Sequence, residues 1–371
     1  YFLPNNFFTI LVVNLFKLAA ERGIPCALVK SGVSTLWVDY CLDKMRGADK
    51  PDSELTDQER LYRKLIITPR ELKLSGYEGG KNPEFEGAAY VTIQEGDIRL
   101  VNHDFSTYTT EVGFKFVSEL LLGLMDPKAQ RMLGGVKVRL VVGFEESAGF
   151  GFGVDVLDEY GNLIRRYLIP DKDGLTAGVL MFALQAHLGK SLYQLYEEAK
   201  EEFDPALHNE RQDVAASTGV KVRIINGLLD TCQAPAVVPQ ELKVRALAII
   251  DYFKAIGGER THIGGICYDR FNIMTVDEQG MPVIFRARMS GTEPICRIYI
   301  EASTEKVRTE VRELVDEWIL ACNLYEIRNT PDIFSLFDLL SVIRSILPCF
   351  GEKQVFRAHR MVLRFLIVLI F

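Results

Sequence analysis

The chain has 371 residues, of which 48% are hydrophobic and 25% are charged, and its formal net charge is −7. This length allows two or three domains of ordinary globular composition. The negative charge argues against a nucleic-acid partner, because phosphate backbones are bound by basic surfaces. Seven cysteines without CxxC spacing argue against a zinc site and for a reducing compartment, so we expect a cytoplasmic protein.

The first part of the chain predicts alternating helices and strands. Helices are expected over 6–21 and 35–45, because apolar residues recur there at intervals of three and four, and the apolar run 25–30 predicts a buried strand between them. This order is typical of an α/β layer with parallel strands. Residues 47–106 are expected to form an insertion, with a capping box from Thr56 to Glu59, a glycine-rich loop over 76–87 and a hairpin over 88–101.

A loop rich in carboxylates and glycine follows the next predicted strand. A helix ending near Leu124 is followed by alternating apolar residues, which predict a strand over 136–142. Open α/β sheets bind ligands just beyond such a strand, and Glu145 in this loop can accept hydrogen bonds from sugar hydroxyls. An ordinary solvated loop is the simpler explanation. Farther on, Asp173 suits the start of a helix, whereas Lys172 has no evident structural role.

A domain boundary is predicted over 203–216, which is polar and contains Pro205. The segment beyond it predicts a compact α+β domain. Its expected elements are strands over 221–225, 265–269, 272–276 and 283–288, a helix over 240–256 and a helix from Thr304 to about 322. The tail 324–371 is atypical, and its apolar end, 361–371, is shorter than the roughly 20 residues that span a membrane, so we expect no membrane partner.

The segment from Arg288 to Arg297 lies between two predicted strands and has the chemistry of a phosphate site. Ser290 and Thr292 carry hydroxyls that can donate to phosphoryl oxygens, and Gly291 lets the backbone close around an anion. The two arginines carry planar guanidinium groups that can bind phosphate in a bidentate way. A polar hairpin turn with solvated arginines explains the composition equally well, so residue types alone leave both explanations open.

The order of the residues favours the phosphate site. Arg-x-Ser-Gly-Thr-Glu-Pro over 288–294, followed by Arg-x-Tyr-x-Glu over 297–301, resembles the phosphate-binding loop in the last domain of the α-D-phosphohexomutases, such as phosphoglucomutase and phosphomannomutase. Met289 replaces the usual proline. The segments Gly113–Phe116, Gly143–Ser147 and Lys172–Gly174 resemble segments of the family's third domain, in the same order.

The resemblance implies a fold and a division into domains. Residues 1–205 are expected to form a three-layer α/β/α domain with a mixed or parallel sheet, similar to the family's third domain. Residues 210–323 are expected to form a smaller α+β domain, similar to its fourth. The insertion 47–106 and the tail 324–371 lie outside the resemblance.

The resemblance also implies roles for individual residues. Glu145 and Ser147 would hold sugar hydroxyls, Lys115 would lie near the ligand, and Lys172 is a further possible contact. The phosphate would be held by a larger set: Arg288, Ser290, Gly291, Thr292 and Arg297. Phe144 and Ala148 stand where the family has glycine. We expect their Cβ atoms to crowd the loop that contains Glu145 and Ser147.

Two catalytic parts of the family do not occur in this sequence. The family transfers a phosphoryl group through a phosphoserine in a Ser-His-Asn loop, with Mg²⁺ bound by an Asp-x-Asp-x-Asp-Arg loop. Neither motif is found, so we predict no catalytic residue, metal ligand or cofactor in this chain, and expect Mg²⁺ only for a full-length enzyme of the family.

We therefore expect the C-terminal half of a phosphoglucomutase- or phosphomannomutase-like isomerase. Such an enzyme interconverts hexose 1-phosphate and hexose 6-phosphate, and its partners would be glucose or mannose phosphates and the missing N-terminal domains. This chain would supply sugar and phosphate binding and would be inactive alone. The alternatives are a non-catalytic sugar-phosphate-binding module and a decayed gene product.

Overall fold

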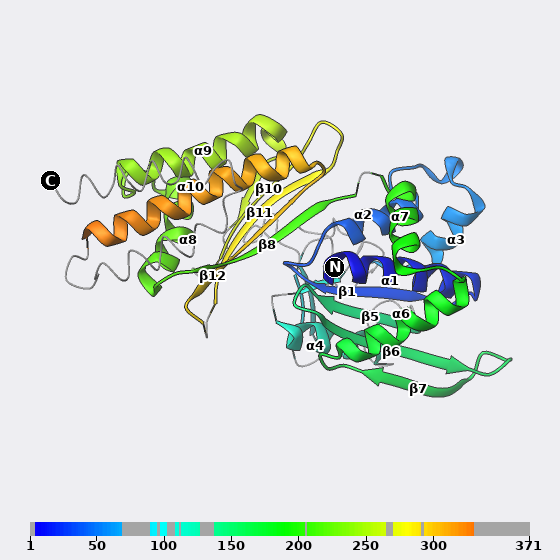
Figure 1. Cartoon of the computed structure of the whole chain (residues 1–371). Coiled ribbons are helices and arrows are strands. Elements are labelled where there is room, and N and C mark those ends of the chain that lie inside the picture. The colour runs from blue at the N-terminus through cyan, green and yellow to red at the C-terminus, as the bar shows by residue number, and fades with distance from the viewer. Residues whose placement is uncertain are drawn as a thin grey trace. The chain divides into compact units, whose positions relative to one another are not determined.

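The computed structural model describes residues 4–68, 90–94, 97–101, 108–110, 113–126, 137–204, 206–264, 270–290 and 293–329. The chain divides into two compact units between Leu207 and His208, and each unit contains its own sheet (Figure 1). The predictions over 76–87 and 265–269, and the tail beyond 329, lie outside the described residues. None of the described helices combines the length and the apolar character needed to cross a membrane.

The first unit is built on a mixed five-stranded sheet with the order β4-β1-β5-β6-β7. Strands β4 (Tyr108–Thr110), β1 (Cys26–Ser31) and β5 (Leu140–Glu145) are parallel, whereas β6 (Gly149–Leu157) and β7 (Leu163–Ile169) continue the sheet antiparallel. Strand β5 starts at Leu140, later than predicted, and its ladder with β6 continues to Glu145. Glu145 therefore lies on the sheet and not in a loop.

Helices cover both faces of this sheet. Apolar residues of α4 (Phe114–Met125) pack with Ala27, Val29 and Val141 on one face. On the other face, Phe8 of α1 (Pro4–Glu21) packs against the ring of Phe144. Helix α6 (Gly174–Leu188) lies beside α1 on β6, and α2 (Trp37–Met45), α3 (Asp57–Leu65) and α7 (Leu192–Glu202) also contact α1. The result is the three-layer α/β/α arrangement that was expected.

Helix α4 approaches the sheet closely because the strands beneath it carry glycines. We call Gly143, Gly149, Gly151 and Gly153 the glycine floor. A Cβ atom added at Gly143 would lie 2.7 Å from Val117, and one at Gly153 would lie 3.2 Å from Met125. Contacts under about 3.4 Å force neighbouring atoms to move, so side chains here would lift the helix from the sheet.

Local signals explain where several elements begin. Thr56 and Glu59 form the predicted capping box of α3, and Ser191 forms a second box at the start of α7. Strands β2 (Tyr90–Gln94) and β3 (Asp97–Val101) pair antiparallel, which confirms the predicted hairpin. A short 3₁₀ turn, Asp52–Glu54, precedes α3.

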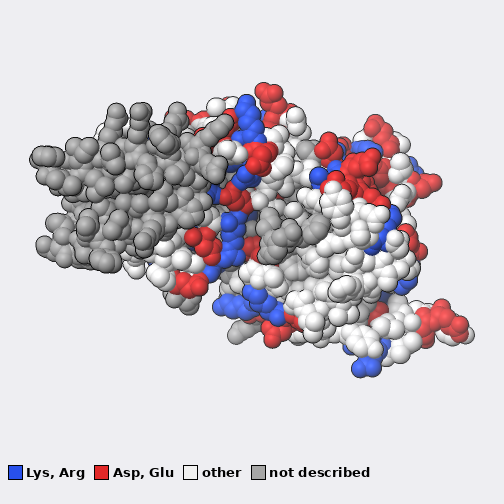
Figure 2. All heavy atoms as spheres, in the orientation of Figure 1, with Lys and Arg blue, Asp and Glu red and all other residues white. Residues whose placement is uncertain are grey.

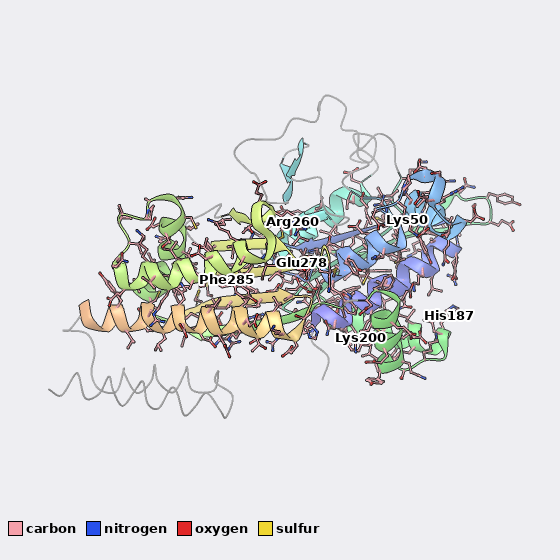
Figure 3. The ribbon with its side chains drawn as sticks, turned by 90° about the horizontal axis from the view of Figure 1, so that it is seen from above. Lys50, His187, Lys200, Arg260, Glu278 and Phe285 are labelled. Carbon is pink, nitrogen blue, oxygen red and sulfur yellow. The ribbon has the colours of Figure 1, made fainter. Side chains whose placement is uncertain are left out.

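The second unit has an antiparallel five-stranded sheet with the order β8-β12-β11-β10-β9. Its strands are β8 (His208–Ala215), β9 (His262–Gly264), β10 (Arg270–Val276), β11 (Pro282–Met289) and β12 (Ile295–Ala302). One face packs against α8 (Thr218–Gln233), α9 (Gln240–Gly257) and α10 (Glu305–Asn329), with a 3₁₀ turn, Gly258–Arg260, after α9. Phe285 of β11, labelled in Figure 3, is fully buried in this core.

Two predictions in the second unit are wrong. Residues 221–225 lie within helix α8 and not in a strand, because the Ser217 hydroxyl caps the helix through the Val220 amide and Ile224 and Leu228 align on its buried side. Residues 208–215 form strand β8, although their polar composition predicted a boundary segment. One edge of β8 pairs with β12, and polar residues are tolerated in a strand at the edge of a sheet.

Candidate functional site

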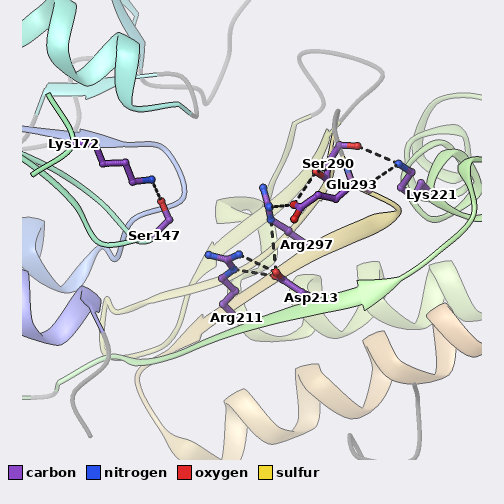
Figure 4. Close-up of polar contacts among 8 residues, drawn as sticks. All are labelled: Ser147, Lys172, Arg211, Asp213, Lys221, Ser290, Glu293 and Arg297. Atoms are coloured by element: carbon purple, nitrogen blue, oxygen red, sulfur yellow. Dashed lines mark hydrogen bonds and ion pairs between the residues drawn. The ribbon is translucent and has the colours of Figure 1, made fainter. Parts of the chain in front are cut away.

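Two of the predicted sugar-binding residues, Glu145 and Ser147, meet the further candidate Lys172 at the end of strand β5. The Glu145 side chain is only 6% exposed, and its Oε1 atom accepts hydrogen bonds from the Ser147 hydroxyl and the Lys172 ammonium. Lys172 Nζ also lies 2.8 Å from Ser147 Oγ (Figure 4). We call these three residues the sugar turn. A carboxylate, a hydroxyl and an amine at one place can donate to and accept from the hydroxyls of a sugar.

The structure supplies a reason for the position of Lys172. Its neighbour Asp173 caps α6, with Oδ1 accepting from the amides of Leu175 at 2.9 Å and Thr176 at 3.1 Å. The Asp173 amide in turn donates to the Phe150 carbonyl of β6. The hydrogen bond from the Thr176 hydroxyl lowers the pKa of Asp173, which keeps this cap ionised. Lys172 is therefore held between a helix cap and the sheet.

Lys115 lies in the first turn of α4, close to the sugar turn in the fold. The preceding residue, Phe114, and Glu145 both lie within 2.8 Å of a Cβ atom added at Gly149, so the start of α4 borders Glu145. The Lys115 side chain is exposed, and its ammonium lies 4.6 Å from the centre of the Phe116 ring. This is a cation–π contact at the helix surface.

A buried polar network lies at the carboxyl ends of β1 and β5, where ligands bind in open α/β sheets. Lys30 Nζ is 3.0 Å from Asp39 Oδ2, and both side chains are almost fully buried. Ser31 Oγ is 3.3 Å from Glu146 Oε2. These residues were not among the site residues predicted from the sequence. The available signal was a lysine at the end of an apolar run. A lysine that is buried in a sheet requires a partner of opposite charge.

Phe144 and Ala148, which stand where the family pattern has glycine, are accommodated in different ways. Phe144 is fully buried, and its ring lies 5.2 Å from that of Phe8, so it fills the core and does not crowd the sugar turn. The expected crowding at this position is wrong, because the side chain points between the sheet and α1. Ala148 adopts a φ of 64°, a left-handed conformation that costs a residue with a Cβ atom about 1–2 kcal/mol.

Replacing Ala148 with glycine is expected to raise the free energy of unfolding by roughly 0.5–1 kcal/mol. The relief of backbone strain exceeds the entropy that glycine adds to the unfolded chain. Urea denaturation measures the change. Ala215→Gly is the control, because Ala215 lies exposed in a strand at ordinary φ, and this variant should lose stability. A loss of stability in both variants would contradict the assignment of strain to Ala148.

In the second unit, two predicted arginines lie side by side. Arg288 of β11 and Arg297 of β12 are directly paired across the strands, so their side chains share one face of the sheet. Ser290 follows β11 and is buried. Gly291 and Thr292 lie outside the described residues. Two like charges opposite one another favour an anion between them.

The two arginines differ in their partners. Arg297 Nη2 donates to Glu293 Oε2 at 2.5 Å, and Arg297 Nε lies 3.8 Å from Asp213 Oδ2 (Figure 4). Arg211 holds Asp213 through two hydrogen bonds of 2.9 Å. Among the described residues, no acceptor is hydrogen-bonded to the buried Nε of Arg288, and the same holds for the Nε of Arg297. A donor that is buried and unpaired is costly, and a phosphoryl oxygen would satisfy it.

Lys221 of α8 supports this loop from inside the unit. Its ammonium donates to the Ser290 and Glu293 carbonyls, both at 3.1 Å, and so joins the two ends of the loop. Only 9% of the residue is exposed. The sequence analysis missed it, because a lysine in an expected strand had no visible partner 69 residues away.

The thiol of Cys296, next to the loop on strand β12, is not suited to nucleophilic chemistry. Burial raises the pKa of the Cys296 thiol to about 12, although Lys221 and Arg288 lower it. The residue therefore stays protonated at neutral pH. On the face drawn in Figure 2, basic and acidic side chains are interspersed.

Comparison with known proteins identifies part of the chain. Residues 88–203 match the family model described as phosphoglucomutase/phosphomannomutase, alpha/beta/alpha domain III. The matched residues include 88–106, so the insertion expected over 47–106 overlaps the matched domain. A search of curated protein sequences found no match.

Solved structures of sugar-phosphate mutases are also similar to the chain. A putative phosphomannomutase from Thermus thermophilus is 17% identical, with a TM-score of 0.39 over 86% of this chain and 41% of that one. N-acetylphosphoglucosamine mutase from Aspergillus fumigatus, in complex with GlcNAc-6P and magnesium, is 12% identical, with a TM-score of 0.40 over 85% of this chain and 46% of that one. The chain thus spans less than half of the length of either protein.

The residues that match the family model lie in the first unit, which contains the sugar turn and the start of α4. Residues 88–203 are therefore similar to the alpha/beta/alpha domain III of phosphoglucomutases and phosphomannomutases.

Proposed function

We propose that this chain supplies ligand-binding groups of an enzyme that interconverts hexose 1-phosphate and hexose 6-phosphate. The observation that carries the proposal is the convergence of Glu145, Ser147 and Lys172 within the matched domain. In this proposal they hold sugar hydroxyls, with Lys115 close to them. Glucose and mannose phosphates are the proposed ligands.

The second unit supplies the phosphate contact in this proposal. Arg288, Ser290 and Arg297 offer two guanidinium groups and a hydroxyl, and Gly291 and Thr292 would complete the loop. The paired positions of the arginines and the unpaired Arg288 Nε support this role.

The proposal assigns no phosphoryl-transfer step to this chain. No group of His, Cys, Asp and Glu within the described ranges is placed to hold a metal ion, so the Mg²⁺ of the family is assigned to none of these residues. We propose that the phosphoserine and the metal site belong to other domains of the enzyme, in a reducing compartment such as the cytoplasm.

Titration calorimetry of Ser147→Ala tests the sugar-binding role. We expect the variant to bind glucose 6-phosphate about 5- to 10-fold more weakly than the unmodified chain, because a neutral hydrogen bond contributes about 1 kcal/mol. Its affinity for inorganic phosphate should not change, since phosphate has no sugar hydroxyl. Equal losses for both ligands would contradict the role, and Ser118→Ala, which removes a half-buried hydroxyl that donates to the Phe114 carbonyl within α4, is the control.

A further inference from the structure

The carboxylate of Glu293 lies between two groups assigned to phosphate. Its Oε2 atom accepts from Arg297 Nη2 at 2.5 Å and lies 3.3 Å from the Ser290 hydroxyl. A phosphoryl oxygen bound to these two groups would take the position of this carboxylate oxygen. Glu293 is thus a negatively charged group of the chain itself at the anion position.

The hydroxyl of Ser290 shows why the two anions compete. It accepts from the Glu293 amide at 3.2 Å and has one proton, which is directed to the Glu293 carboxylate. To donate to a phosphate, the hydroxyl has to release the carboxylate. The Glu293 side chain is 52% exposed and can turn into solvent, so this exchange needs no change in the core.

The charges of the neighbouring groups set the outcome of the exchange. Arg297 is already close to two carboxylates, those of Glu293 and Asp213. A ligand with one negative charge would replace the Glu293 carboxylate by an anion of equal charge, so the attraction to the guanidinium groups would not increase. A phosphate monoester carries two charges and therefore gains more from the guanidinium groups.

From this geometry we propose that Glu293 makes the loop selective for dianions, so that it takes phosphate monoesters and disfavours diesters and carboxylates. The inference rests on the proposed phosphate-binding role of the loop and adds a residue that determines specificity. Asp213, held by Arg211, assists by keeping Arg297 partly neutralised.

The test compares methyl phosphate with dimethyl phosphate at pH 8, where the first is a dianion and the second a monoanion. Calorimetry on the full chain gives both affinities for the unmodified protein and for Glu293→Gln. We expect the variant to bind both ligands more tightly. The affinity for dimethyl phosphate should rise about two- to fivefold more than that for methyl phosphate, so the preference for methyl phosphate becomes smaller. Glu317→Gln removes an equal charge from an exposed pair with Arg245, and it should leave the ratio unchanged.

Arg297→Ala separates this inference from the proposed function. If it weakens methyl phosphate binding while Glu293→Gln leaves the ratio unchanged or weakens both ligands, the loop binds phosphate but Glu293 does not set its selectivity. If Arg297→Ala also leaves binding unchanged, the loop is not a phosphate site at all. Equal melting temperatures of the variants show that the differences do not come from unfolding.

Discussion

Arg288→Ala is expected to weaken binding of hexose phosphate by about 1.5–3 kcal/mol, or roughly 10- to 150-fold in Kd. The Nε atoms of both arginines are buried without a hydrogen-bond acceptor among the described residues, but Arg297 is in addition close to two carboxylates. Arg288 therefore has more capacity for a ligand anion. Calorimetry with glucose 6-phosphate and inorganic phosphate measures the loss, which should be similar for both ligands.

Arg286→Ala is a matched control for this experiment. Arg286 lies two residues earlier on the same strand and face, and its Nε donates to Asn272 Oδ1 at 2.9 Å. The control removes the same charge but not a group of the loop, so we expect less than about a fivefold change in Kd. Equal effects of the two variants would show that the loop responds to net charge and does not contact the ligand through Arg288.

Lys30→Met is expected to lower the free energy of unfolding by about 3–5 kcal/mol. The Lys30 side chain is 1% exposed and its ammonium lies 3.0 Å from Asp39, so its removal breaks a buried ion pair by taking away only one of its two charges. A single charge left in this position costs far more than the lost attraction. Chemical denaturation measures the change.

Two further variants isolate the cause. Lys30→Met combined with Asp39→Leu removes both charges and should recover most of the stability, because apolar residues of similar volume often replace a buried pair without loss. Lys50→Met breaks an exposed pair with Glu59 and should cost at most about 1 kcal/mol. A similar cost for Lys30→Met and Lys50→Met would mean that burial does not dominate the effect.

Much of the fold could be predicted because its signals are local. The capping boxes at Thr56 and Ser191 involve residues three apart, and the alternation in β11 and β12 appears directly in the sequence. The mixed sheet follows the predicted order of helices and strands. The sugar turn was also accessible, since its residues fall in short segments that resemble those of one family.

Other features depend on partners that are distant in sequence. The pattern Val-Lys-Val-Arg at 220–223 alternates like a strand, but its helical state follows from the Ser217 cap and from packing against the sheet. The role of Lys221 depends on carbonyls 69 and 72 residues away. Glu293 appeared only as part of a motif, because its contact with Ser290 and Arg297 requires the loop to be folded.

The glycine floor has a consequence for which substitutions the core can accept. Helix α4 rests on it from Phe114, which borders Glu145, to Met125 above Gly153. A methyl group added at Gly153 would lie 3.1 Å from Leu168 and 3.2 Å from Met125, so these side chains would have to move beneath the last turn of the helix. Variation at the glycine floor is thus limited by the side chains of the helix that carries Lys115 in its first turn.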